Sequence, residues 1–118
     1  MDYETLLSLA ESGDTKAMIT IGGMYADFQG DKKNLDLEEA FKWFARSGEY
    51  GDVNGMKLAA SIGCIDSHIL LKIAPFEWEH AMQKLTQALY WAEKALENGD
   101  ETAESEIIDI KDELGVAK

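Results

Sequence analysis

The residues best suited to chemistry lie close together near the middle of the chain. Cys64 and His68 are four positions apart, Asp66 lies between them, and His80 follows downstream. On one helix face, a thiol and an imidazole at this spacing can form a nucleophile with its base, or part of a small metal site. The alternative is that Cys64 is a small buried apolar residue and the histidines are half-exposed surface residues. We favour this alternative, because one thiol and two dispersed histidines are a weak pattern for either site.

Other patterns typical of enzymes are weak as well. Gly22-Gly23 is interpreted as a small-residue contact within a helix, and the Gly-Asp pairs of the chain are followed by no Lys-Ser or Lys-Thr, so no phosphate-binding loop is predicted. Paired carboxylates such as Glu38-Glu39 are typical of a solvated helix face. The sequence therefore predicts a protein that is not an enzyme and that uses neither a cofactor nor a metal ion.

The elements that position these residues repeat along the chain. The pattern Gly-Asp-x-x-small occurs at 13–17, 51–55 and 99–103, with spacings of 38 and 48 residues. Trp43 and Trp91 both lie 8 residues before the glycine of the turn that follows them. Between these landmarks the apolar residues recur at helical spacing. Each unit is therefore predicted to consist of two helices that meet at a glycine.

The residues at the turns support the prediction of two helices in each unit. Each of these glycines is expected to end a helix with positive φ, and the Asp after it to cap the next helix by accepting from its free N–H groups. The small residue three positions after the Asp lets two helix axes approach closely, and the polar stretch 28–34 links two helices. No strand is predicted. The expected helices are 2–12, 15–28, 36–49, 53–63, 76–98 and 101–114.

The second spacing exceeds the first by 10 residues, and the excess falls between Gly63 and Ala88. We place this insertion near 64–80, a segment that contains the only Pro, the only Cys and both His. Pro75 suits the first turn of the long helix that follows, after a short helical turn over 67–73. Aromatic residues at the repeat positions are expected in the core: Trp43, Phe44, Tyr90 and Trp91.

The order of these residues resembles the Sel-one-like repeat family. Residues 40–55 and 88–103 follow the family pattern Ala-x-x-Trp-Tyr-x-Lys-Ala-Ala-x-x-Gly-x-x-x-Ala, and residues 17–25 follow its Leu-Gly-x-x-Tyr ending. The resemblance implies an all-α fold, a short αα-superhelical solenoid of tetratricopeptide-like hairpins with about 6 helices. It also implies a family of adaptors and scaffolds that bind other proteins. The first matching segment reads Ala40-x-x-Trp43-Phe44-x-Arg46-Ser47-Gly48-x-x-Gly51-x-x-x-Gly55.

The resemblance covers nearly the whole chain and implies one repeat domain, 1–118. The match loosens after Gly55 and after Ala103, so the last helix is interpreted as the polar cap that the end of a solenoid needs. The predicted units are a partial unit 1–14, unit 15–52, unit 53–100 with the insertion near 64–80, and the capping helix 101–118.

Charge restricts the classes of partner. The 118 residues include 23 acidic and 11 basic side chains, for a net charge of −12 and a pI near 4.4. Nucleic acids and anionic membranes both need a positive surface, so direct binding to either is not expected, and a basic protein is the expected partner. A single cysteine, no apolar run of membrane-spanning length and no secretory signal pattern favour the cytoplasm. The oligomeric state is left open.

The charge is concentrated near the end of the sequence. Residues 93–113 carry nine acids and two lysines, a net charge of −7. This segment is either a solubilising cap or an electrostatic docking surface for a basic protein. Exposed positions on the first helix of each pair, Thr20, Met24, Asp27 and Lys57, are a second candidate surface. The predicted protein-binding residues are Trp78, Tyr50, Phe76, Asp27, Glu101, Glu104 and Asp109.

Two functions from different classes fit this sequence. The first is a small acidic bacterial inhibitor or immunity protein that binds and neutralises a basic toxin or nuclease. Its support is the size, the charge, the missing signal sequence and the lack of catalytic motifs. The second is a general adaptor or scaffold in a signalling or assembly complex. An acidic mimic of nucleic acid differs from the first only in its partner. The acidic last helix favours a free-standing unit over a segment of a longer solenoid, and so favours the first function.

Overall fold

The computed structural model describes residues 2–26 and 36–115, and this part of the chain is all-α. It contains six α-helices and one 3-10 turn, and no strand. This confirms the predicted fold class, although the expected helix 15–28 ends at Tyr25 and the linker 28–34 lies outside the described residues. The elements are α1 (Tyr3–Glu11), α2 (Thr15–Tyr25), α3 (Leu37–Glu49), α4 (Val53–Ile73), η2 (Pro75–Glu77), α5 (Trp78–Glu97) and α6 (Ala103–Leu114).

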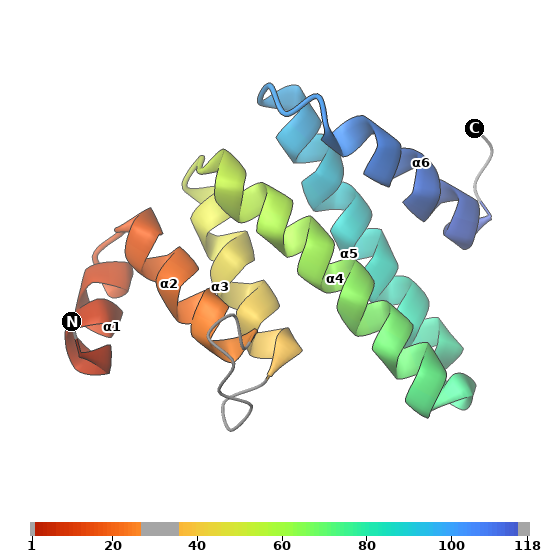
Figure 1. Cartoon of the computed structure of the whole chain (residues 1–118), viewed down its shortest axis with the longest axis horizontal. Helices are drawn as coiled ribbons and strands as arrows, with labels where there is room; N and C mark the ends of the chain where they lie inside the picture. The colour runs from red at the N-terminus through yellow and green to blue at the C-terminus, as the bar shows by residue number, and fades with distance from the viewer. Residues whose placement is uncertain (1, 27–35, 116–118) are drawn as a thin grey trace.

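The helices pack in chain order. Each helix makes its main contacts with the helices before and after it in the sequence, and the α4–α5 pair is the most extensive. Figure 1 shows the resulting stack, which runs from α1 at one side to α6 at the other. The stack measures 45 × 34 × 20 Å. Its core is therefore a series of local interfaces between neighbouring helices.

The glycines of all three Gly-Asp turns have the predicted positive φ, and the Asp caps the next helix at the first two turns. Gly13 and Gly51 adopt φ of 104° and 94°, in the left-handed region that favours glycine. Oδ1 of Asp14 and Oδ1 of Asp52 each accept hydrogen bonds from two backbone N–H groups at the start of the next helix. At the third turn, Asp100 accepts from the Thr102 N–H before the helix starts, so α6 begins two residues later than predicted.

Close packing between helices depends on small residues facing large ones. Ala17, Gly55 and Ala103, the small residues after each Gly-Asp pair, are all buried, as expected. Of the four aromatic residues predicted in the core, Trp43, Phe44 and Trp91 are buried. The prediction for Tyr90 is wrong. Its side chain is 52% exposed. The ring makes a perpendicular contact with the ring of Trp91, and Nζ of Lys94 lies 5.6 Å from its centroid.

A buried hydroxyl without a partner among the described residues lies at one of the tightest of these contacts. Ser47 is fully buried against Gly55, where an added Cβ would lie 2.6 Å from the Ser47 Oγ. Oγ of Ser47 has no hydrogen-bond partner among the described residues. A buried polar group that has lost its water without gaining a partner destabilises the folded state.

Replacing Ser47 with Ala is therefore expected to raise the free energy of unfolding by about 1 kcal/mol. Urea denaturation followed by circular dichroism measures the change. Ser67→Ala is the matched control, because Ser67 is equally buried but its Oγ donates to the Ala81 carbonyl at 2.8 Å. We expect the control to be destabilised by about 1 kcal/mol. The same sign for both variants would contradict the prediction.

The predicted insertion is not a separate segment. The expected helix 53–63 continues without a break to Ile73, and the expected helical turn over 67–73 is part of this same 21-residue helix. Pro75 starts the 3-10 turn η2 and lies before α5, whose first residue is Trp78. The additional residues therefore lengthen both helices of one hairpin. In Figure 1 the α4–α5 hairpin projects past the ends of α3 and α6.

Candidate protein-binding surfaces

The Asp and His side chains that the sequence offers for catalysis or metal binding contact different groups in the structure. Nε2 of His68 lies 2.7 Å from Oε2 of Glu113, and Oδ2 of Asp66 accepts from Nζ of Lys84 at 2.8 Å. Nδ1 of His80, in α5, lies 3.9 Å from Oε2 of Glu77, at the end of η2. Asp66, His68 and His80 therefore each have a different ion-pair partner.

The environment of Cys64 is the reverse of what a nucleophile needs. Burial, together with the nearby carboxylates of Glu106, Glu113 and Asp109, raises the pKa of its thiol to about 12. The thiol is therefore protonated at neutral pH, whereas a reactive cysteine has its thiolate stabilised by positive charge. Within the described part of the chain, no group of three or more His, Cys, Asp or Glu side chains is placed to hold a metal ion.

The acidic last helix has two distinct sides. Ala103, Ile107 and Ile110 are buried and face the core. The opposite side is exposed, and we call it the acidic face. Because side chains three or four positions apart are neighbours on a helix, its members form a continuous surface that includes one apolar side chain. The acidic face consists of Glu104, Ile108, Asp109 and Asp112 of α6, together with Glu101 in the turn before it.

Three carboxylates of the acidic face have no cation beside them among the described residues. Glu101, Glu104 and Asp109 are exposed and form no ion pair with another described residue. Ile108, which the sequence analysis did not single out, is 47% exposed among them. Its position one turn from Glu104 is visible in the sequence. Glu106 differs from this set, because it is partly buried beside the groove between α4 and α6 and its desolvation raises its pKa.

The predicted aromatic anchors lie at different places in the stack. Phe76 and Trp78 are 81% and 57% exposed at the tip of the long hairpin. Tyr50 is also exposed, but it lies in the turn between α3 and α4, where its ring contacts Gly13. The 21 residues of α4 separate this turn from the hairpin tip by roughly 30 Å. These residues therefore do not form a single site. The remaining predicted residue, Asp27, lies outside the described residues.

The hairpin tip carries more apolar surface than the sequence analysis predicted. Ile65, Ile69 and Ile73 are 46%, 43% and 73% exposed and lie on successive turns of α4. The four-residue spacing of these isoleucines was a readable signal. It was missed because the segment 64–80 was interpreted as an insertion and not as part of one continuous helix. With Phe76 and Trp78, these three isoleucines form what we call the apolar tip.

A groove runs along the first helices of the successive pairs. One part, of about 610 Å³, lies between α2 and α4 and includes Lys16, Thr20 and Lys57. A second part, of about 270 Å³, lies between α4 and α6 and shares Lys57 and Ser61 with the first. The structure thus brings two residues of the second candidate surface, Thr20 and Lys57, to one groove. Met24, also predicted there, is not among the lining residues.

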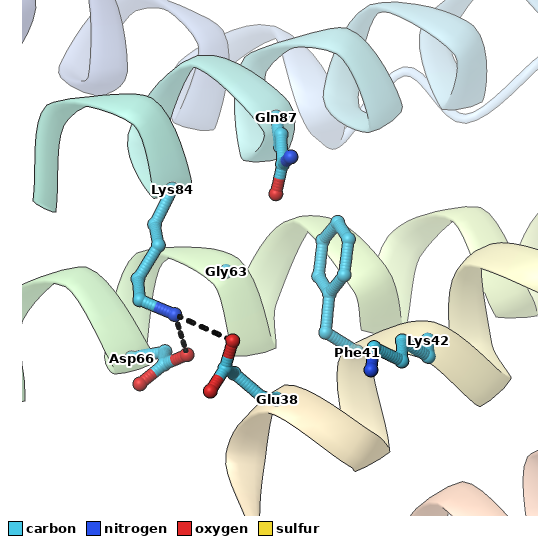
Figure 2. A pocket seen from close by; sticks show the side chains of 7 residues that line it. All are labelled: Glu38, Phe41, Lys42, Gly63, Asp66, Lys84 and Gln87. Atoms are coloured by element: carbon cyan, nitrogen blue, oxygen red, sulfur yellow. Dashed lines mark hydrogen bonds and ion pairs between the residues drawn. The ribbon is translucent and has the colours of Figure 1, made fainter. Parts of the chain in front are cut away.

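A separate pocket of about 200 Å³ lies between α3, α4 and α5. Figure 2 shows an ionic cluster on one side of it, where Nζ of Lys84 approaches the carboxylates of Asp66 and Glu38. The ring of Phe41 and the amide of Gln87 lie on the other side. This pocket has no counterpart in the sequence analysis, because its residues come from three helices and share no spacing pattern.

Comparison of the chain with protein families, with curated proteins and with solved structures gives no match. Among the described residues, no helix combines the length and the apolar character needed to cross a membrane.

Proposed function

We propose that this chain is a non-catalytic protein-interaction module that binds a basic protein through the acidic face. The specific function that we propose is that of a small bacterial immunity protein or inhibitor that neutralises a basic toxin or nuclease in the cytoplasm. We also propose that its helical pairs are Sel-one-like repeats. The observation that supports binding most directly is that Glu101, Glu104 and Asp109 are exposed and lack ion-pair partners among the described residues.

The composition of the acidic face suits a protein partner. Concentrated charge of one sign accelerates association with an oppositely charged surface and orients it. Charge alone gives little affinity, and interfaces usually gain most of their binding energy from a few desolvated side chains. Ile108, exposed between Glu104 and Asp112, supplies such an apolar contact at the centre of the charged surface.

The test starts with the partner. Capture from a lysate of the source cells, followed by identification, is expected to return one dominant basic protein. The triple variant Glu101→Lys, Glu104→Lys and Asp109→Lys should then slow association by about one to two orders of magnitude and reduce its dependence on salt. Surface plasmon resonance at several salt concentrations measures both quantities. If the partner is a toxin or nuclease, the wild-type chain should abolish its activity and the variant should not.

A matched control separates local charge from total charge. Glu4→Lys, Glu79→Lys and Glu93→Lys change the net charge equally at exposed positions outside the acidic face. We expect this variant to retain most of the association rate. Equal effects of the two triple variants would show that the acidic face is only a solubilising cap. Capture of several unrelated neutral proteins would contradict the inhibitor function.

The second candidate function is a general adaptor, and the apolar tip is the observation that favours it. An adaptor needs two separate surfaces, and the apolar tip is a second exposed surface distinct from the acidic face. In that case a ternary complex is expected. Trp78→Ala should then abolish binding of one protein, and the triple lysine variant of the acidic face should abolish binding of the other. An inhibitor would instead form a binary complex with the basic protein.

A further inference from the structure

The ionic groups around the pocket between α3, α4 and α5 are unevenly paired. Nζ of Lys84 donates to Oδ2 of Asp66 at 2.8 Å, whereas it lies 3.8 Å from Oε1 of Glu38, beyond hydrogen-bond distance. Lys42, at the rim, lies 4.0 Å from Glu39 on the same helix. The side chain of Glu38 is 68% exposed, compared with 12% for Lys84. Of the two carboxylates that line the pocket, Asp66 therefore has the hydrogen-bonded cation, and Glu38 has only the longer ion pair.

The opposite side of the pocket offers a flat aromatic surface and an amide. Gly63 brings α4 close to both neighbours, because a Cβ at this position would lie 2.9 Å from Cβ of Ala88 and 3.4 Å from the ring of Phe41. In Figure 2 the side chains of Phe41 and Gln87 project toward one another from α3 and α5, beside the carboxylate of Glu38. An aromatic ring, an amide and an incompletely paired carboxylate thus border one small cavity.

We propose that this pocket binds the guanidinium group of an arginine side chain. A guanidinium is planar, stacks on aromatic rings and donates in a fork to a carboxylate, so it matches Phe41 and Glu38 together. The ammonium of lysine is a compact, strongly hydrated charge that fits the ring less well. An anion is disfavoured, because Lys84, the less exposed of the two lysines that line the pocket, is already paired with Asp66.

The size of the pocket supports one side chain as the ligand. At about 200 Å³ it is smaller than the usual range of roughly 300–1,000 Å³ for small-molecule sites. The inference rests on the proposed function for the source of the arginine, which is a basic partner protein. It can be tested without that partner, because a capped arginine presents the same group.

The probe is N-acetyl-arginine amide, titrated into the full ¹⁵N-labelled chain and followed by NMR. We expect saturable shifts of the Gln87 side-chain amide and of the Phe41 backbone amide, with a Kd on the order of 1 mM. N-acetyl-lysine amide should bind about tenfold more weakly. Sodium acetate should cause no saturable shift around Lys84. Shifts with acetate alone would assign the pocket to anions and overturn the proposal.

Two neighbouring glutamates provide a matched pair of variants. Glu38→Gln removes the incompletely paired carboxylate and should weaken binding of the arginine probe about tenfold. Glu39→Gln removes the same charge from a residue that does not line the pocket, and should leave binding unchanged. Equal effects of the two substitutions, equal binding of the two probes, or no saturation by about 10 mM would each overturn the inference.

Binding of the arginine probe does not depend on whether the acidic face binds a basic protein. A basic protein that binds while the arginine probe fails overturns only the pocket assignment. Conversely, probe binding with the expected selectivity, in a chain that captures no basic protein, supports the pocket and counts against the proposed function.

Discussion

Replacing Phe44 with Ala is expected to lower the free energy of unfolding by about 3–5 kcal/mol. The side chain is fully buried in the larger core cluster, and its ring lies directly over Gly22 of α2. Truncation removes this apolar contact and leaves a cavity that the surrounding helices fill only in part. Because a small domain has only about 5–15 kcal/mol of total stability, the loss is a large share of it. Chemical denaturation followed by circular dichroism at 222 nm measures the effect.

Phe76→Ala is the matched control for this substitution. It removes the same atoms, but Phe76 is 81% exposed at the hairpin tip. We expect a change within about 0.5 kcal/mol, as is usual for exposed positions. If both phenylalanine variants were destabilised equally, the packing of α3 against α2 would not be as described.

Replacing Gly22 with Ala is expected to destabilise the chain by about 1–2 kcal/mol, although Ala is the better helix former. In an unobstructed helix the substitution would gain about 0.5–1 kcal/mol. Here the added Cβ would lie 2.6 Å from Cε1 of Phe44, and overpacking of this kind costs about 1–3 kcal/mol. The steric cost therefore exceeds the gain in helix propensity, and urea denaturation should show a lower midpoint.

A double-mutant cycle tests the cause of this effect. In the Phe44→Ala background the obstructing ring is absent, so the added methyl group occupies part of the cavity. Gly22→Ala should then become neutral or stabilising, with a coupling energy of about 1–3 kcal/mol. Additive effects of the two substitutions would contradict the direct contact between residue 22 and the Phe44 ring.

Local signals predicted most of the fold correctly. The Gly-Asp pairs at 13–14 and 51–52 end one helix and cap the next because φ preference and N-capping depend on a few adjacent residues. The prediction failed where a repeat spacing was extended to a segment without such a pair. Residues 64–73 contain no helix-ending signal, so α4 continues through them, and the additional length goes into the hairpin.

The candidate surfaces were predictable to different degrees. The acidic face could be predicted because nine acids in 21 residues, spread over the end of α5, the turn and α6, exceed what this helical pair can bury. The exposure of Tyr90 could not be predicted, because it depends on the rotation of α5 against its neighbours. Similarly, the apolar tip is exposed because α3 and α6 are shorter than the hairpin they flank, a relation between elements that no local spacing encodes.

The sequence by itself determined the helical class, the two well-formed Gly-Asp turns and the concentration of negative charge at the last helix. These depend on backbone preference, apolar periodicity and composition, which are properties of neighbouring residues. Only the tertiary structure decided that Glu38, Asp66 and Lys84 meet beside Phe41. Their separations in the chain reach 46 residues, so their proximity depends on the lengths and rotations of three packed helices.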